Sequence, residues 1–273
     1  MKIAHSGILL SLLFPLILFA GPASKVEPTN AEEAATAKAA AEAVVAEKYA
    51  ARVATLTPPH RAWEKVLQEN LGSFYLPIHQ KEKVEGRSNA WDYVEDDPAL
   101  PRVLLIGDSV SRGYTMAVRK ALAGKGNVHR APANCGPTKS GIEKLDVWLG
   151  DGKWDLIHFN FGIHDRATPL PDYETRLREI VDRLAATGAK LVWATTTPVP
   201  DTTDGKYTGA PIVERNAVAA KVMAEKGVVV NDLFTAITPK LSTLQNPDDV
   251  HFTAAGYDFL GEKVATVIAG ELK

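Results

Sequence analysis

Short apolar runs alternate with helical patterns from residue 101 to the C-terminus, and this alternation constrains the fold more than any other feature. The run at residues 103–106 is continuously apolar, as is typical of parallel strands covered on both faces, and the other runs are comparable. The runs lie at residues 103–106, around Val128, and at 156–161, 191–195 and 228–230. Helical patterns lie at 114–123, 142–149, 173–186, 212–226 and 254–272. This order predicts an α/β protein, a three-layer α/β/α sandwich with about five parallel strands, over residues 101–273.

The N-terminal segment has the pattern of a signal peptide. Lys2 and His5 precede an apolar run at residues 8–20, which is shorter than the roughly 20 residues that a membrane-spanning helix needs. Gly21 and Ala23 then satisfy a small-x-small cleavage rule. We therefore expect a signal peptide over residues 1–23, an exported protein in the periplasm or medium, and no stable membrane insertion of the mature chain. An uncleaved anchor is the alternative.

Residues 24–100 are expected to form a helical and irregular extension. Residues 31–56 are rich in alanine, which favours a helix but supplies little apolar volume for packing. This helix could be a tether or could bind a partner. A second short helical pattern follows around residues 63–71, and residues 81–101 are polar and irregular.

Charge and cysteine content exclude several classes of function. Lys and Arg number 31 against 33 Asp and Glu, so the net charge of −2 creates no global field for nucleic acid. The single cysteine, Cys135, excludes an internal disulfide and a multi-thiolate metal site.

The loops that follow the strands carry the candidate chemistry, because ligands of such sheets bind at the carboxyl ends of the strands. Residues 107–114 read GDSVSRGY, with Ser109 at the turn from strand into helix. A hydroxyl there is near free backbone N–H groups that could stabilise an oxyanion. Ser109 could equally be a helix N-cap.

A second motif, near the C-terminus, favours the interpretation of Ser109 as a nucleophile. Asp248 precedes His251 by three residues, so within one turn its carboxylate could orient the imidazole while the other ring nitrogen accepts a hydroxyl proton. Asp249 is the competing carboxylate, and we assign it to solvent or to local capping. Thr253 is placed to cap the last helix.

These residues resemble the SGNH or GDSL hydrolases, esterases with a flavodoxin-like core, over about residues 103–268. Gly107, Asp108 and Ser109 match the family's GDS block, and Asp248 and His251 match its DxxH block. The resemblance implies that Gly136 supplies a backbone N–H to the oxyanion hole. The family's GxND block reads Gly162, Ile163, His164 and Asp165 here, with histidine in place of asparagine.

The resemblance makes His164 the position where this chain departs from its family. An imidazole N–H could replace the asparagine amide as the third oxyanion donor. Alternatively, His164 is a structural histidine and the hole has two backbone donors, or it is a metal ligand, although no second ligand is apparent.

Other chemically able residues near these motifs have simpler interpretations. Cys135 is expected to be a packed thiol, and His158, inside an apolar strand, a core histidine. Arg215 and Asn216 could anchor their helix or touch substrate. Trp91, Tyr93 and the loop at residues 200–211 are expected to border the site.

The expected reaction is acyl transfer to water through Ser109, His251 and Asp248, with the backbone N–H groups of Ser109 and Gly136 and the ring of His164 as oxyanion donors. No metal or organic cofactor is required by this mechanism. The expected substrate is a small-molecule or glycan ester, with carbohydrate O-acetyl groups first. A lipolytic esterase or lysophospholipase is the alternative, followed by a non-catalytic glycan-binding domain.

Overall fold

A computed structural model describes residues 30–150, 152–202, 204–205 and 207–273. The expected signal peptide at residues 1–23 lies outside this range. The chain divides into two units, Met1–Ala41 and Glu42–Lys273. Within the described residues, no helix has both the length and the hydropathy to cross a membrane.

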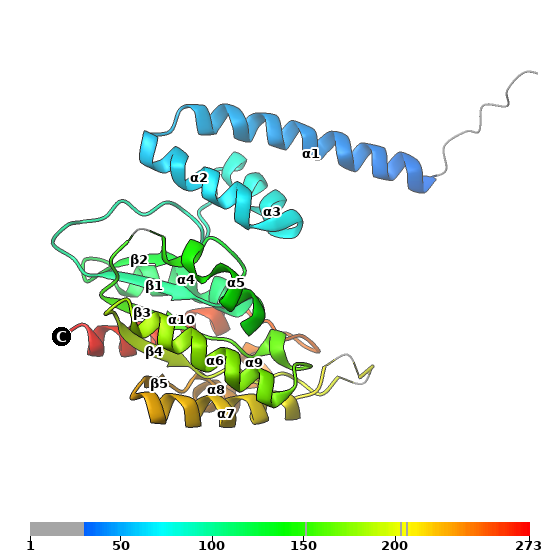
Figure 1. The fold of residues 1–273 in the computed structure, drawn as a ribbon. Coiled ribbons are helices and arrows are strands. Elements are labelled where there is room, and N and C mark those ends of the chain that lie inside the picture. The colour runs from blue at the N-terminus through cyan, green and yellow to red at the C-terminus, as the bar shows by residue number, and fades with distance from the viewer. Residues whose placement is uncertain (1–29, 151, 203, 206) are drawn as a thin grey trace, which may run out of the picture. The chain divides into compact units, whose positions relative to one another are not determined.

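Five parallel strands form one sheet in the second unit (Figure 1). They are β1 (Arg102–Ile106), β2 (Asn127–Arg130), β3 (Leu156–Phe159), β4 (Lys190–Ala194) and β5 (Val229–Asn231). Their order in the sheet is β2-β1-β3-β4-β5, and every pairing is parallel. The order reverses between β1 and β3, so the loops after these two strands diverge and leave room for a ligand. The predicted fold class is confirmed.

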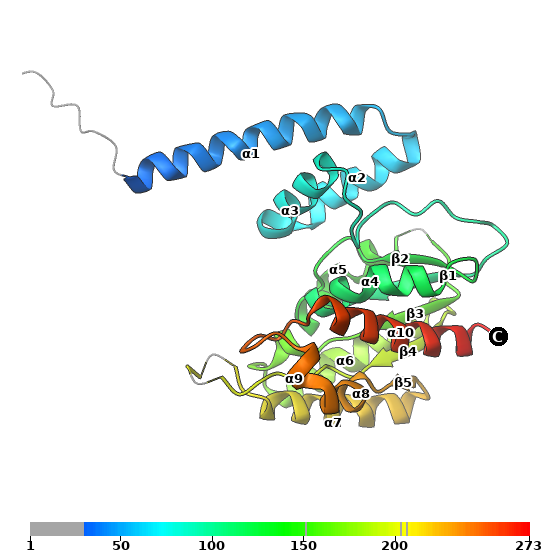
Figure 2. The ribbon, with the colours of Figure 1, turned by 180° about the vertical axis from the view of Figure 1, so that it is seen from behind.

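Helices cover both faces of the sheet, as the continuous apolar strands require (Figures 1 and 2). The helices that follow the first four strands are α4 (Ser109–Ala121), α5 (Thr138–Leu149), α6 (Leu170–Ala185) and α7 (Ala210–Lys226). The last helix is α10 (Ala254–Glu271), and it packs beside α4. Short helices α8 (Leu233–Ile237) and α9 (Leu241–Leu244) precede it.

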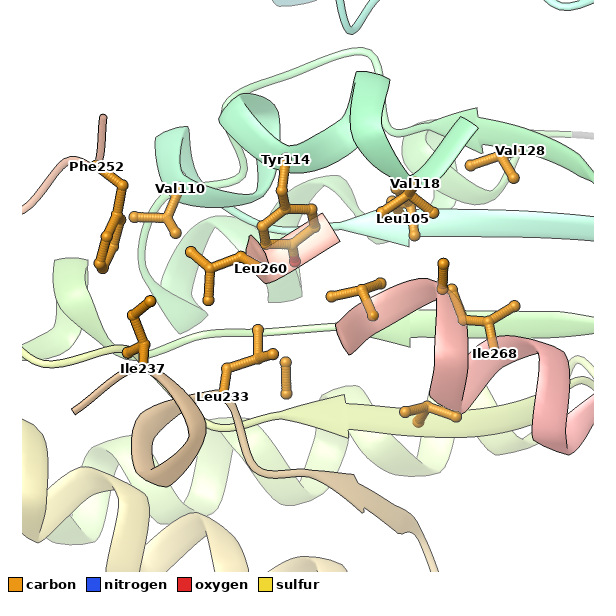
Figure 3. Packing of buried hydrophobic residues seen from close by; sticks show 14 of the residues in the cluster. Leu105, Val110, Tyr114, Val118, Val128, Leu233, Ile237, Phe252, Leu260 and Ile268 are labelled. Carbon is orange, nitrogen blue, oxygen red and sulfur yellow. The ribbon is translucent and has the colours of Figure 1, made fainter. Parts of the chain in front are cut away.

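Side-chain alternation along the strands divides the core into two layers. Leu105 of β1 packs with Tyr114 of α4 and Leu260 of α10 in one layer (Figure 3). Leu104, its neighbour in β1, faces the opposite layer with residues of α5, α6 and α7. Because both layers are apolar, the sheet is anchored from both sides and holds its loops in fixed positions.

Three helices precede the sheet. They are α1 (Asn30–Ala54), α2 (Pro58–Asn70) and α3 (Gly72–Val84). The first two agree with the sequence-based expectation, whereas α3 was not expected. Gly72 and Pro77 act as breaking signals in sequence, yet Pro77 lies inside the helix. Packing of Tyr75 and Leu76 of α3 against the cluster around the buried Trp91 offsets this weak propensity.

Candidate active site

Ser109 lies at the first position of α4, directly after the turn that follows β1. The helix cap is Asp108, whose side chain accepts a hydrogen bond of 2.9 Å from the Val110 N–H. The alternative that Ser109 caps the helix is therefore wrong. Its hydroxyl remains available for another partner, and its backbone N–H belongs to the free N-terminal turn of the helix.

The turn before Ser109 is stabilised by the fully buried Arg130, at the end of β2. The guanidinium donates to the carbonyl oxygens of Gly107 and Asp108 at 3.0 and 2.9 Å and to the Ser111 Oγ at 2.6 Å. A Cβ at Gly107 would lie 2.7 Å from that same Oγ, so the turn needs glycine there. Nothing in the sequence pattern had pointed to Arg130.

A continuous hydrogen-bonded chain joins Ser109, His251 and Asp249. The Ser109 Oγ lies 2.8 Å from the His251 Nε2, and the His251 Nδ1 lies 2.9 Å from the Asp249 Oδ1. A carboxylate only accepts hydrogen bonds, so Nδ1 carries the proton and Nε2 accepts from the serine hydroxyl. Burial raises the pKa of Asp249, but the hydrogen bond and charge of His251 outweigh it and lower that pKa below its ordinary value. The carboxylate therefore stays ionised next to the imidazole.

The carboxylate partner of His251 corrects the sequence-based expectation. Asp248 is exposed and has a positive φ of 50°, and the carboxylate that bonds to the His251 ring is that of Asp249. The expectation assumed a regular turn, in which residues three apart lie on one side. The left-handed conformation at Asp248 interrupts such a turn and brings Asp249 to the imidazole instead.

The two residues suggested as further oxyanion donors come from the segments that follow β2 and β3. Gly136 has a φ of 68°, and its neighbour Cys135 donates its N–H to the Gly107 carbonyl at 3.1 Å, next to the nucleophile turn. His164 is exposed and lines the same pocket as Ser109 and His251. The buried Asp165 ties the two loops together, because its carboxylate accepts from the N–H and hydroxyl of Thr138 at 2.8 and 2.7 Å.

Ser109 and His251 open onto a pocket of about 530 Å³. Its walls come from α3, the start of α4, the loop after β3, the loop before α7 and the segment before α10. The described residues that line it are Phe74, Tyr75, Ile78, Ser109, Arg112, Ile163, His164, Arg166, Tyr207, Asn246, Val250, His251, Phe252 and Tyr257.

The expected borders of the site are partly correct. Tyr207, from the loop at residues 200–211, lines the pocket. Trp91 is buried and is not among the lining residues, and its ring lies 5.7 Å from the Arg112 guanidinium. Tyr93 lies elsewhere, stacked on His60 with ring centres 5.0 Å apart. The wall from α3, with Phe74 its most exposed member, had no signal in the sequence because that helix was not expected.

The remaining candidates have structural roles. Burial raises the pKa of the Cys135 thiol to about 12, so it stays protonated. His158 is fully buried in β3, and its Nε2 pairs with the Asn231 amide at 3.2 Å. Arg215 donates to the carbonyl oxygens of Asp165 and Thr168, which resolves its role as an anchor.

Asn216 is an anchor as well. Its side-chain oxygen accepts from the Thr196 N–H at 2.9 Å, and its amide donates to the Thr196 carbonyl at 2.8 Å. This pair fixes the loop after β4 in the way a backbone partner would.

Comparison with known proteins agrees with this geometry. Residues 105–259 match the GDSL-like Lipase/Acylhydrolase family. No curated protein sequence matches the chain significantly.

Similar solved structures include a lipase/acylhydrolase from Enterococcus faecalis, with 23% identity and a TM-score of 0.57, covering 63% of this chain and 97% of that one. The acetyl xylan esterase AlAXEase has 14% identity and a TM-score of 0.54, covering 61% and 99%. Axe2, an acetylxylan esterase from Geobacillus stearothermophilus, has 17% identity and a TM-score of 0.52, covering 63% and 94%.

The family match spans more than half of the chain and includes both Ser109 and His251. It agrees with the resemblance inferred from the GDS block, and the neighbouring structures share the fold. The chain therefore belongs to the GDSL-like lipase/acylhydrolase family, the SGNH hydrolases, and is an ester hydrolase.

Proposed function

We propose that the protein is a serine esterase that removes acetyl groups from carbohydrates through an acyl-enzyme intermediate. The observation that carries the proposal is the hydrogen-bonded chain from Ser109 through His251 to Asp249, opening onto a pocket. Two neighbours of similar fold are named as acetyl xylan esterases, which supports the substrate class.

The first half-reaction forms the acyl-enzyme. The His251 Nε2 takes the hydroxyl proton as the Ser109 Oγ attacks the ester carbonyl, and Asp249 stabilises the imidazolium that results. Collapse of the tetrahedral intermediate breaks the ester bond, and the imidazolium returns its proton to the departing sugar oxygen. A water molecule, deprotonated by the same imidazole, then attacks the acyl-serine and releases acetate and free Ser109.

The oxyanion of both intermediates requires hydrogen-bond donors. In the proposed mechanism these are the backbone N–H of Ser109, at the N-terminus of α4, the N–H of Gly136 and the His164 ring. The position of Ser109 in the first helical turn supports its part in this assignment.

The test compares wild-type protein with Ser109→Ala and with Ser242→Ala, an exposed serine on α9 as the control. Ser109→Ala should lower kcat for p-nitrophenyl acetate by about 10³-fold or more, since no nucleophile remains. A fluorophosphonate should label only Ser109, as read by peptide mass spectrometry. Activity retained in folded Ser109→Ala, or labelling at another serine, would overturn the mechanism.

A lipolytic esterase is the alternative function, because the apolar side chains of Phe74, Tyr75 and Ile78 line the pocket. The acyl length that the enzyme prefers in its substrates distinguishes the two functions. The expected kcat/KM decreases from p-nitrophenyl acetate through butyrate to octanoate. A maximum at octanoate would assign the pocket to lipid substrates instead.

Export of the protein is part of the same proposal. The apolar run at residues 8–20 and the small residues Gly21 and Ala23 support removal of a signal peptide. Mass spectrometry of the protein recovered from a secreting host should give an N-terminus at Ser24. An intact Met1 would contradict export by cleavage.

A further inference from the structure

Two arginines stand in the wall of the catalytic pocket. Arg112 lies one helical turn after Ser109 on α4, so both side chains project from the same face of the helix. Arg166 follows His164 by two residues in the loop after β3. Because they come from different elements, they provide two separate cationic positions in one pocket.

Neither arginine has an acidic partner among the described residues. The Arg112 guanidinium lies over the rings of Tyr75 and Trp91, at 5.5 and 5.7 Å, and its buried Nε has no hydrogen-bond partner. Arg166 donates to the Ile163 carbonyl at 3.1 Å and lies 5.3 Å from the Tyr207 ring. Neutral partners orient both guanidinium groups but leave their charge uncompensated.

Several arginines outside the pocket pair with carboxylates, whereas Arg119 and Arg130 bond to carbonyl oxygens. Arg102 pairs with Asp96 at 2.8 Å, and Arg178 pairs with Glu174 and Glu225, each at 2.7 Å. The protein as a whole has a net charge of −2, so carboxylates are not scarce. Arg112 and Arg166 lack such a carboxylate and line the pocket, so their charge is available to a ligand there.

The pocket as a whole is cationic. No Asp or Glu is found among the described residues that line it. The triad carboxylate, Asp249, is directed at the His251 Nδ1, where its charge is paired. A concave site with guanidinium groups and no lining carboxylate attracts anions and concentrates them near the nucleophile.

We propose that the natural substrate is an O-acylated acidic glycan, whose sugar carboxylates pair with Arg112 and Arg166 while Ser109 attacks the acyl group. This deepens the proposed function and rests on it. Guanidinium groups bind planar carboxylates through two parallel hydrogen bonds, and the free N–H groups of Arg112 are suited to that geometry. Two cationic positions suit a polymer with a carboxylate on successive sugars, whereas an anionic lysophospholipid has a single charged headgroup.

Substrate preference tests the inference with purified protein. Acetylated polygalacturonate should have a kcat/KM at least about tenfold above that of acetylated xylan, a neutral polymer, when acetate release is measured. The advantage should shrink as salt rises from 20 to 500 mM, because ions screen the attraction. Equal rates on the two polymers would overturn the inference.

Variants of the two arginines test whether these residues cause the preference for the acidic polymer. Arg112→Gln and Arg166→Gln should each lower the ratio of the two kcat/KM values by about fivefold to tenfold, mainly through KM for the acidic polymer. Arg176→Gln, which removes an arginine that does not line the pocket, should keep the wild-type ratio. A ratio unchanged in both pocket variants, with melting temperatures near wild type, would also overturn the inference.

Two further substrates distinguish failure of this inference from failure of the proposed function. Wild-type protein inactive on p-nitrophenyl acetate would refute the proposed function, whereas activity there without preference for the acidic polymer would refute only the inference. A lysophosphatidylglycerol micelle hydrolysed faster than either polymer, with that rate lost in Arg112→Gln, would assign the arginines to a lipid phosphate and overturn the glycan assignment.

Discussion

Two adjacent aspartates differ completely in their relation to His251. Asp249 accepts from the His251 Nδ1 and is ionised, whereas the neighbouring Asp248 is exposed. A carboxylate at Nδ1 holds the imidazole in the tautomer that can accept the serine proton. The role of the third triad member is therefore expected to belong to Asp249 alone.

Asp249→Asn should lower kcat by about 10³- to 10⁴-fold, because an amide donor at Nδ1 favours the wrong tautomer. Asp248→Asn, its matched control, should remain within about threefold of wild type. Steady-state kinetics on p-nitrophenyl acetate measure both. The reverse pattern, with Asp248 sensitive and Asp249 tolerant, would show that the i, i+3 spacing identifies the partner after all.

His164 is the residue at which the chain departs from the GxND block, and its place in the oxyanion hole stays a prediction. Loss of one donor costs about 10² to 10³ in kcat, with little change in ground-state binding. His164→Ala should therefore lower kcat by that factor at nearly constant KM, and His164→Asn, which restores an N–H donor, should recover part of it. Kinetics and melting temperatures are measured together. A His164→Ala variant with kcat within about threefold of wild type and a lowered melting temperature would assign the histidine a structural role.

At the scale of secondary structure, strand β3 places an ionisable side chain, that of His158, in the core. Burial lowers the pKa of His158 to about 3, from an ordinary value near 6.5, so the folded state keeps this ring neutral. The unfolded state binds a proton below about pH 6.5 and the folded state does not. The contribution of His158 to stability is thus complete above pH 6.5 and is lost as the pH falls toward 3.

His158→Gln should make the free energy of unfolding less dependent on pH under acidic conditions. The wild-type free energy of unfolding should lose up to about 1.4 kcal/mol for each pH unit below 6.5 through this group, and the variant should lack that part of the slope. Urea unfolding between pH 7 and 4.5 measures it. Ser242→Ala, at an exposed position, should keep the wild-type slope; equal slopes for wild type and His158→Gln would contradict the assignment.

At the scale of the whole molecule, helices α2 and α3 belong to the same unit as the sheet, Glu42–Lys273. The family match begins at residue 105, yet the fully buried Trp91 lies 5.8 Å from the Arg130 guanidinium that supports the nucleophile turn. Arg119 of α4 also donates to the carbonyl oxygens of Asn89 and Asp92. The extension therefore stabilises the active site as well as lining its pocket.

Trp91→Ala should lower the free energy of unfolding by about 3 to 5 kcal/mol, the usual cost of removing a large buried aromatic side chain. Phe74→Ala, at a ring that is 69% exposed, should cost less than about 1 kcal/mol and serves as the control. Urea unfolding at neutral pH compares them. Similar small losses in both variants would mean that the extension does not stabilise the hydrolase fold.

The sequence by itself determined the sheet, because parallel strands buried on both faces are largely apolar and each of the five runs overlaps a strand. It also indicated the strand-to-helix turn at Ser109 and the capping of α10, since the Asp108 and Thr253 caps bond to backbone N–H groups close in the chain. Helix α4 starts at Ser109, before the expected residue 114, because its first turn is polar and faces the site.

Only the tertiary structure decided which carboxylate meets His251, because a single left-handed residue changes the direction of the side chains that follow it. Arg130, Arg112 and Arg166 were likewise invisible in sequence, since an arginine acquires its role from the groups that surround it. The same holds for α3, whose propensity is weak and whose formation depends on packing around Trp91. Turns and helix caps depend on residues that are neighbours in the sequence, whereas contacts between distant segments depend on how the whole chain folds.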